Sequence, residues 1–272
     1  MPPDDRWRYR GMPAVLATMH AKERVIAPLL HDGLGLKVDA ITGIDTDRFG
    51  TFSRETARQG SALDAARAKI AAAFDLAPAI RVGLASEGSF GPDPRIPFFP
   101  IGHELVVMID RERGLELAGS YAGPETNYAS VVASTLDTAL AFAQRSGFPG
   151  HGLIVIGCED GKPAPAAFLD KEVTETARLE VAVQTALRLC GAAFIETDMR
   201  AHRNPTRMSA IARATRDLVR RFDSRCPDCG WPGFDVTRRI AGLPCSVCGT
   251  PTRRVLAERL TCLHCDRLEE RP

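Results

Sequence analysis

The sequence predicts an α/β fold, in which a mixed β-sheet is flanked by helices, followed by a small cysteine-rich module. Short apolar segments alternate with amphipathic helical patterns along most of the chain. Two apolar segments are joined by a tight turn, which indicates one antiparallel hairpin within that alternation. Six of the eight cysteines lie in the last fifth of the chain. With 272 residues, 44% of them apolar, the chain can form one sizeable core and a small appendage.

The first part of the chain predicts three strands separated by two helices. Each strand is a short apolar segment, and each helix repeats apolar residues on one face. The third strand is expected to end in a turn-rich loop over 86–94, because glycine and proline are frequent there. The strands are expected at 14–17, 36–41 and 80–85, and the helices at about 21–34 and 63–74.

The next part predicts the hairpin, then further strands and helices in alternation. The hairpin pairs 104–111 with 115–121 across the turn Arg-Glu-Arg-Gly. A helix after Asn204 is expected because asparagine is a good N-cap and Pro205 suits the first helical position. The helices are expected at 136–144, 174–190 and 205–222, and the strands at 153–156 and 193–196.

Three CxxC pairs predict a zinc-ribbon-like module in residues 223–272, after an α/β body in residues 1–222 that carries the candidate active site. CxxC curls the backbone so that both sulfurs face one point, and a second pair completes a tetrahedral four-sulfur site. Four thiolates leave no open position for a reactive water, so the Zn²⁺ is expected to be structural. The predicted ligands are Cys226, Cys229, Cys245, Cys248, Cys262 and Cys265.

The alternatives to zinc fit less well, and the pairing of the cysteines stays open. A disulfide framework is disfavoured in a chain without a secretory signal, and three pairs in about 40 residues fit a ribbon better than a redox site. Residues 249–261 read as a hairpin that would join Cys245 and Cys248 to the last pair. Pairing the first CxxC with either of the others is equally consistent, and the spare pair could hold a second zinc with His264 or another ligand.

The end of the chain is basic although the formal net charge of the whole is only +1. From residue 200 onward there are 15 arginines, no lysine and 8 acidic residues. Such a tail can contact nucleic acid or phosphates, or can be the solvated surface of a small domain. The N-terminus has no apolar segment typical of a secretory signal, and no stretch of 18 apolar residues predicts a membrane span. We therefore expect a cytoplasmic protein that does not bind membranes; the oligomeric state is not predicted.

Three polar loops are expected to follow strands, where ligands collect in open α/β sheets. The carboxylates of these loops would hold a hard cation such as Mg²⁺ and form the catalytic site. Each carboxylate also has a structural interpretation, as a turn cap or a member of an internal ion-pair network. The candidate catalytic residues are Asp45, Asp47, Glu87 and Asp198.

Basic residues near the same loops are candidates for binding a phosphorylated substrate. Arginines can bind phosphate oxygens in bidentate fashion, and the N-terminus of the helix after Asn204 adds an anion site. A lysine one turn into the helix after the first strand can also reach a phosphate, although it would equally suit a solvated first turn. These candidates are His20, Lys22, Arg200, Arg203, Asn204 and Arg207.

With these residues in view, the chain resembles a bacterial family of unknown function along nearly its whole length. The shared motifs are Thr-Met-His-Ala-Lys-Glu (18–23), Asp-Thr-Asp-Arg-Phe-Gly-Thr-Phe (45–52), Leu-Ala-Ser-Glu-Gly-Ser-Phe-Gly (84–91) and Asp-Met-Arg-Ala-His-Arg-Asn-Pro-Thr-Arg-Met (198–208), followed by the CxxC tail. The resemblance implies no particular activity.

The body is also similar, more weakly, to the inosine-triphosphate pyrophosphatase superfamily. In that superfamily a Thr-x-Asn-x-x-Lys loop grips phosphates and a carboxylate after a later strand holds Mg²⁺. Here Thr18, His20 and Lys22 stand in the loop, with histidine for asparagine and the lysine one position closer. The resemblance implies that Glu87 is the metal carboxylate and that Lys69 lies on the central basic helix.

Two functional classes follow from the sequence. The first is an Mg²⁺-dependent phosphate-ester hydrolase or nucleoside triphosphate pyrophosphohydrolase, acting on a phosphorylated small molecule or nucleotide. The second is a binding module, in which the Arg-rich ribbon docks on nucleic acid or protein and the α/β body is a non-catalytic scaffold.

Overall fold

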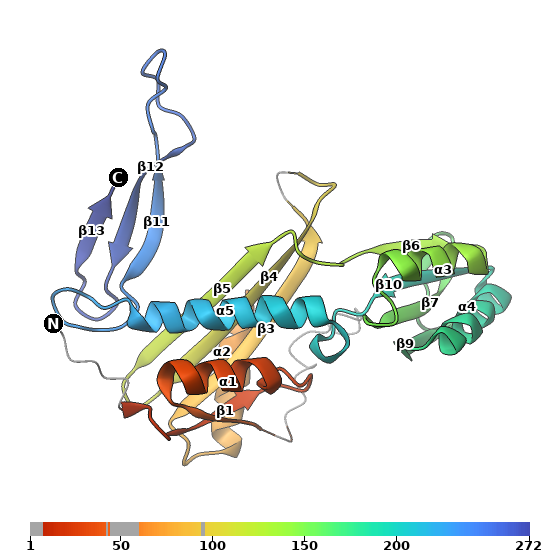
Figure 1. Ribbon diagram of the computed structural model, residues 1–272, viewed down its shortest axis with the longest axis horizontal. Coiled ribbons are helices and arrows are strands. Elements are labelled where there is room, and N and C mark those ends of the chain that lie inside the picture. Colours follow the sequence, from red (N-terminus) through yellow and green to blue (C-terminus); the bar gives the residue numbers. More distant parts are fainter. Residues whose placement is uncertain (1–7, 42, 44–59, 94–95) are drawn as a thin grey trace.

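The computed structural model describes residues 8–41, 43, 60–93 and 96–272. Two of the predicted carboxylate ligands, Asp45 and Asp47, lie outside these residues. The described part of the chain contains helices and three β-sheets (Figure 1), which confirms the predicted α/β class.

The central sheet is mixed and has the strand order β2-β1-β3-β4-β5. β1 is parallel to both of its neighbours, whereas β3, β4 and β5 form an antiparallel meander. The predicted hairpin between the fourth and fifth strands is confirmed. The strands are β1 (Pro13–Ala17), β2 (Lys37–Ala40), β3 (Val82–Pro92), β4 (Pro100–Asp110) and β5 (Leu115–Gly123).

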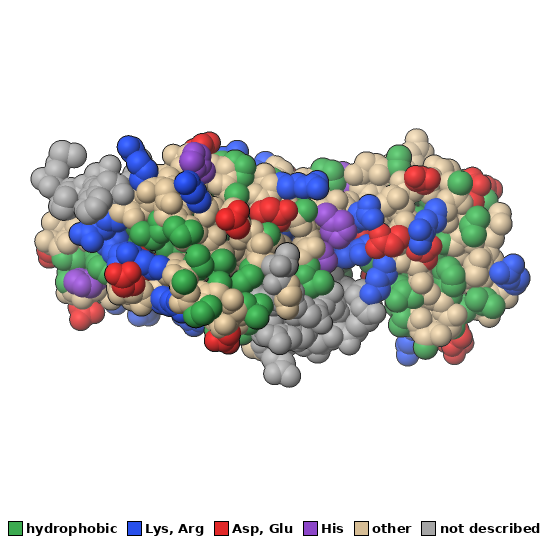
Figure 2. All heavy atoms as spheres, turned by 90° about the horizontal axis from the view of Figure 1, so that it is seen from below, with side chains coloured by type: hydrophobic (Ala, Val, Ile, Leu, Met, Phe, Trp, Pro, Cys, Tyr) green, Lys and Arg blue, Asp and Glu red, His purple; other side chains and the backbone are tan. Residues whose placement is uncertain are grey.

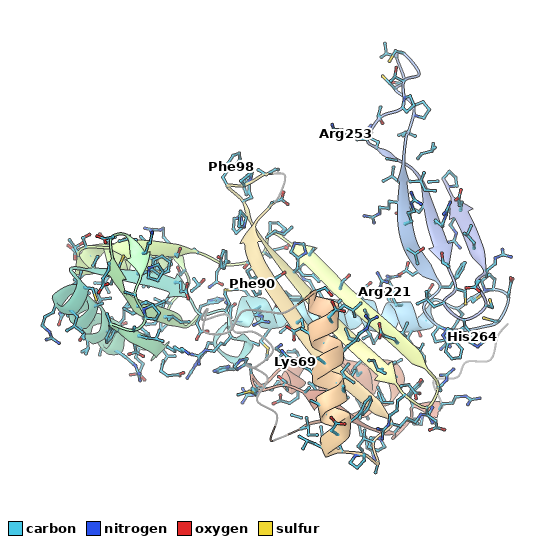
Figure 3. The ribbon with its side chains drawn as sticks, turned by 180° about the vertical axis from the view of Figure 1, so that it is seen from behind. Lys69, Phe90, Phe98, Arg221, Arg253 and His264 are labelled. Carbon is cyan, nitrogen blue, oxygen red and sulfur yellow. The ribbon has the colours of Figure 1, made fainter. Side chains whose placement is uncertain are left out.

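Helices cover both faces of the central sheet (Figures 1 and 3). On one face, α1 (Glu23–Leu34) and α5 (Pro205–Asp223) pack on a core that includes Leu84 and Met108. On the other face, α2 (Ala62–Leu76) packs on a smaller core. A Cβ at Gly119 would lie 2.2 Å from the backbone nitrogen of Leu218, so this glycine allows α5 to lie directly on β5.

A second sheet with its own core lies between β5 and α5 in the sequence and beside the central sheet in space (Figure 1). Its order is β6-β10-β7-β8, and β9 also pairs with β7. α3 (Leu136–Arg145) and α4 (Thr176–Cys190) contribute to its core. The strands are β6 (Ser130–Ala133), β7 (Leu153–Glu159), β8 (Lys162–Pro163), β9 (Leu169–Val173) and β10 (Ala192–Thr197).

The third sheet is the C-terminal ribbon, an antiparallel arrangement of β11 (Asp235–Ala241), β12 (Val255–Thr261) and β13 (Leu268–Arg271). It extends away from the end of α5 (Figure 1). The base of the ribbon packs on the body at Gly233, which has a φ of +88°. A Cβ at this position would lie 2.6 Å from the side chain of Leu117 of β5, so only glycine allows this close approach.

Two sequence predictions about these strands were wrong. The turn-rich loop expected over 86–94 is mostly strand, because β3 continues to Pro92 in register with β4. Glycine is compatible with that pairing, and Gly88 faces side chains that leave no room for a Cβ. The hairpin expected over 249–261 is instead formed by β11 and β12. Consequently Glu87 lies within a strand, and Cys245 and Cys248 lie between the two strands of a hairpin.

None of the helices in the described part of the chain combines the length and the apolar character that crossing a bilayer requires.

Candidate metal centre and buried charged cluster

Four cysteines at the base of the ribbon form a candidate metal centre. The Sγ atoms of Cys226, Cys229, Cys262 and Cys265 all lie within 4.8 Å of one another. Two of the separations are 3.7 Å (Cys226 to Cys265) and 3.6 Å (Cys229 to Cys262). A tetrahedral zinc with Zn–S bonds of about 2.3 Å requires sulfurs about 3.8 Å apart, whereas a disulfide bond is about 2.05 Å. The four thiols therefore fit a metal ion such as zinc.

Local backbone geometry explains why these cysteines point together. In the first pair, Cys226 N–H donates to Trp231 O and Gly230 N–H donates to Cys226 O, both at 2.9 Å. Gly230 then takes a φ of +72°, which suits glycine. In the last pair, Cys262 N–H donates in the same way to Arg267 O at 2.8 Å. The CxxC spacing thus produces two matching turns, and the pairing β11-β12-β13 brings them to one end of the sheet.

The metal centre also touches the body of the protein. Cys226 and Cys262 are buried, whereas the other two ligands are exposed. Trp231 stacks on His264 with ring centroids 4.3 Å apart, and Arg113 of the body lies 5.0 Å from the centre of the Trp231 ring. Trp231 therefore links the metal centre to the core beneath α5.

The remaining predicted ligands, Cys245 and Cys248, lie at the opposite end of the ribbon. β12 spans seven residues between the second and third pairs. At about 3.3 Å per residue a strand of this length covers about 23 Å. Among the described residues, one group of His, Cys, Asp and Glu side chains lies close enough together to hold a metal, and this group is the four cysteines at the base. Pairing of the first and last CxxC, one of the arrangements left open by the sequence, is the one that the structure brings together.

A second candidate site is a set of buried charged residues that crosses the central sheet at β3. Lys69 of α2 forms an ion pair with Glu87 on one face of the sheet. Arg207 of α5 forms an ion pair with Glu104 of β4 on the other face, with Nε 2.7 Å from Oε1. All four residues are at most 7% exposed. Neighbouring strand residues point to opposite faces, so β3 and β4 present charges to both helix layers. We call these residues, with Lys22, the charged cluster.

Arg207 is held from several directions. Its backbone N–H donates to Asn204 Oδ1 at 2.9 Å, so Asn204 caps α5 as predicted. Its guanidinium donates to Met199 O and lies 5.2 Å from the ring centre of Phe90. A Cβ at Gly88 would lie 2.7 Å from Arg207 Nη2, so glycine in β3 makes room for the side chain. Figure 3 labels Lys69 on α2 and Phe90 on β3.

Lys22 is the cation of the cluster without an ion-pair partner among the described residues. Its Nζ donates to Ser86 O at 2.8 Å and to Ser86 Oγ at 3.3 Å, both neutral oxygens. The side chain is buried, and this burial, with the nearby charge of Arg207, lowers the pKa of Lys22 to about 7. An anionic ligand nearby would have the opposite effect and would favour the ammonium form.

Two histidines lie beside the cluster. The rings of His20 and His202 stack with centroids 5.1 Å apart and an interplanar angle of 23°. Burial and the neighbouring charge of Lys22 lower the pKa of His20 to about 3. Burial and Arg200 also lower the pKa of His202. Both rings are therefore neutral at pH 7. Figure 2 shows histidine, basic and acidic side chains gathered near the middle of one face of the molecule.

The remaining predicted residues form a separate network at the junction with the second sheet. The carboxylate of Asp198 accepts from the backbone and the guanidinium of Arg200, at 2.9 Å and 2.8 Å for the shortest bonds. Arg200 and Arg203 both pair with Glu172 of β9. Asn204 donates to Asp198 O at 3.1 Å, which connects this network to the cap of α5.

The structure brings together part of the predicted site and adds residues that sequence reasoning missed. His20, Lys22, Lys69, Glu87 and Arg207 lie near the C-terminal end of β1 and the middle of β3. Glu104, His202 and Glu172 were not predicted as site residues. Glu104 could have been found, because an acid stands where the alternation of β4 places apolar Val106 and Met108 on the core face. Glu172 could not have been found, because no local sequence pattern indicates its pairing with Arg200 and Arg203.

A pocket lies beside the charged cluster, on the α2 face of the central sheet. Its volume is about 250 Å³ and it is open to solvent. Glu87, Ser89, His103 and Ser120 are among its lining residues, and Ala62 at the N-terminus of α2 forms part of its rim. Hydrogen-bond donors and acceptors therefore line a space that is large enough for a small molecule.

Comparison with known proteins gives a family but no activity. No curated protein matches the chain. The match to the domain of unknown function DUF6671 covers residues 69–271, from the middle of α2 to the last strand of the ribbon. The two motifs at 18–23 and 45–52 lie outside it, and so does Lys22. Because the match covers well over half of the 272 residues, the chain belongs to the DUF6671 family.

Proposed function

We propose that the α/β body binds a phosphorylated, nucleotide-like small molecule at the charged cluster and hydrolyses it. The observation that carries the proposal is Lys22, a buried amine whose partners are neutral oxygens. A buried ammonium without a counter-ion is costly, so a position of this kind is favoured where a ligand supplies negative charge.

The charge balance of the cluster supports an anionic ligand. Lys22, Lys69 and Arg207 provide three buried cations against the two carboxylates of Glu87 and Glu104 among the described residues. A phosphate group would neutralise the excess and keep Lys22 protonated. Preorganised cations of this kind also stabilise charge that develops as a phosphate bond breaks. His20, whose ring lies near Lys22 and Arg207, would contribute a hydrogen bond to the same ligand.

Hydrolysis is the reaction suggested by the similarity to the inosine-triphosphate pyrophosphatase superfamily. Mg²⁺ is the metal that such a reaction would use, with Glu87, Asp45, Asp47 and Asp198 as candidate ligands. Within the described residues Glu87 pairs with Lys69 and Asp198 pairs with Arg200, so they do not by themselves form a cation site. We therefore route no step through Mg²⁺ and make the requirement for it part of the test.

For the ribbon, we propose that the metal is Zn²⁺ and that its role is structural. Four thiolates saturate a tetrahedral zinc, which leaves no position for a water or a substrate. The stack of Trp231 on His264, and the contact of Arg113 with Trp231, support a role in fixing the ribbon on the body.

The decisive experiment measures binding and turnover with the same variants. Calorimetric titration with pyrophosphate, followed by phosphate or pyrophosphate release from standard and deaminated nucleoside triphosphates with and without Mg²⁺, would be performed on the full chain. We expect Lys22→Met to weaken binding at least about 10-fold, since a lost charge-assisted contact corresponds to about 1.5–3 kcal/mol. Glu87→Gln should abolish release.

The matched control for these variants is Lys37→Met, which removes an exposed lysine on β2. Unchanged binding and turnover are expected for it. The proposal is wrong if the unmodified protein binds no phosphate-containing ligand. Binding without release in any condition would retain the ligand class and remove the hydrolase part.

A binding module is the second candidate, and one observation favours it. Four of the ribbon arginines are used in ion pairs, as Arg239 with Glu258 and Arg259 with Glu270. Arg238, Arg253 and Arg254 have no ion-pair partner among the described residues. A nucleic-acid complex formed by them would weaken steeply as salt is raised, by about one log–log unit per phosphate contact.

A further inference from the structure

The CxxC pair at the outer end of the ribbon has the same backbone as the two pairs that meet at its base. Cys245 N–H donates to Thr250 O and Gly249 N–H donates to Cys245 O, both at 2.9 Å, as in the turn at Cys226. Gly249 has a φ of +73°, and its counterparts Gly230 and Asp266 have φ values of +72° and +57°. All three turns are therefore of one kind, and two of them already meet as a four-sulfur site.

Within the described part of the chain, the outer turn has no partner turn close enough to share a metal. The seven residues of β12 separate it from the base by about 23 Å. No third His, Cys, Asp or Glu of the described residues comes close enough to join Cys245 and Cys248. Arg253, in the segment between this turn and β12, lies at the outer end of the ribbon, and His264 lies at the base (Figure 3). Cys245 and Cys248 thus form half of a tetrahedral site.

The segment that carries this half-site lacks any core of its own. None of residues 241–256 is buried. The segment is held by a few backbone bonds, such as Thr252 N–H to Leu243 O at 3.0 Å. A small unit without a hydrophobic core usually requires a metal or a disulfide to fix its structure. The ordered backbone of this turn is therefore explained if the turn binds a metal whose remaining ligands come from outside the chain.

A redox role for the pair fits less well. Reactive CxxC cysteines lie at helix N-termini, where the helix lowers the thiol pKa. Cys248 is followed by Gly249 and an extended segment that leads to β12, with no helix in the described ribbon. The features of this turn are those of a metal knuckle, as at the base.

We propose that Cys245 and Cys248 of two copies of this chain bind one shared Zn²⁺, so that the outer ends of two ribbons are joined through a second four-sulfur site. Two identical halves related by a two-fold axis supply the four thiolates that a tetrahedral zinc requires. The site is incomplete without the second copy. It is independent of the proposed function of the body.

The surroundings of the pair favour a second copy as the partner. Val247, between the cysteines, is 91% exposed, and Leu243 beside them is 38% exposed. In a symmetric pair these apolar side chains would cover one another around the metal. Arg253 and Arg254 would offset the negative charge of a zinc bound by four thiolates. The ribbon extends away from the body (Figure 1), so two ends can meet without a clash between bodies.

The test measures zinc content and molar mass on the full chain under reducing conditions. In a zinc-replete preparation we expect about 1.5 zinc ions per chain and a dimer by light scattering. The double variant Cys245→Ser/Cys248→Ser should bind about one zinc per chain and be a monomer. Its Trp231 fluorescence should be unchanged, which shows that the base of the ribbon is still formed. Cys190→Ser, outside the ribbon, is the matched control and should behave as the unmodified protein.

Four outcomes would overturn the proposal. A monomer with one zinc per chain would leave the outer pair without metal, and a monomer with two would mean that the chain completes the site itself. A dimer that persists in the double variant would place the contact elsewhere. Loss of binding to a nucleic-acid duplex in the double variant, without any change in mass, would assign the outer turn to a nucleic-acid interface instead.

Discussion

The metal centre and the charged cluster are assembled in opposite ways. The four cysteines at the base of the ribbon come from two short turns within 40 residues of each other, and each turn is shaped by its own backbone. The charged cluster takes Lys22, Lys69, Glu87, Glu104 and Arg207 from five elements or their ends and buries them inside the largest part of the protein. The first site would be completed by an ion from outside the chain. The second depends on partners within the chain, and among the described residues Lys22 has no ion-pair partner.

The cores around the two sites differ in the same sense. The buried cluster of the ribbon consists of Phe234 and Leu260 together with the ligands Cys226 and Cys262. Half of that core is therefore metal ligand. The core beneath α1 and α5 contains many large apolar residues, and none of the charged cluster belongs to it. Loss of one site should unfold a module, whereas damage to the other should only lower the stability of the body.

Metal removal should give the largest effect. Chelation, or Cys262→Ser, is expected to unfold the ribbon, because structural zinc supplies on the order of 10 kcal/mol of binding free energy that is coupled to folding. Hydrogen exchange should show loss of amide protection throughout 226–271, while β1 to β5 stay protected. Cys190→Ser should leave both regions unchanged. Full protection of β11 and β12 in the metal-free protein would contradict the idea that the metal holds the ribbon.

Breaking the buried ion pair of Arg207 should give an intermediate effect. Glu104→Gln leaves the guanidinium buried beside a neutral amide, and removal of one partner of a buried pair typically costs about 3–5 kcal/mol. The matched control is Glu258→Gln, which removes the partner of Arg239 on the exposed ribbon and should cost about 0–1 kcal/mol. Chemical denaturation measures both losses, in the body for Glu104→Gln and in the ribbon for Glu258→Gln. Equal losses of unfolding free energy in the two variants would show that burial does not increase the contribution of the Arg207 ion pair to stability.

The same contrast explains how much the sequence predicted. The CxxC turns and the cap of α5 at Asn204 are local, so residue spacing was sufficient to predict them. The ion pair between Glu104 and Arg207 joins residues 103 apart, and it depends on the extension of β3 through Gly88. That extension was predicted to be a loop, because glycine and proline commonly indicate turns and the pairing with β4 is not visible locally. Helix and strand order could thus be predicted, whereas the charges brought together across the sheet could not.

The pH dependence contributed by Lys22 should give the smallest effect and the sharpest test of the cluster. Its pKa is about 7 in the folded protein against 10.5 ordinarily, so the unfolded chain binds more protons between these values. Stability should therefore rise with pH from about 7 to 10.5 and carry the full cost of the buried charge below 7. Lys22→Met should flatten this rise and stabilise the body at pH 7, because it removes the cost of burying the charged amine.

The control for this variant and its response to ligand separate a structural lysine from a ligand-binding one. Lys37→Met, on exposed β2, should keep the rise with pH. Pyrophosphate at pH 7 should stabilise the unmodified protein, because the anion supplies the missing counter-charge, and should stabilise Lys22→Met much less. If pyrophosphate stabilises both equally, the anion binds elsewhere and Lys22 serves only to hold Ser86 of β3 to the start of α1. If pyrophosphate stabilises only the unmodified protein, the excess positive charge of the cluster at Lys22 is the feature that selects an anionic ligand.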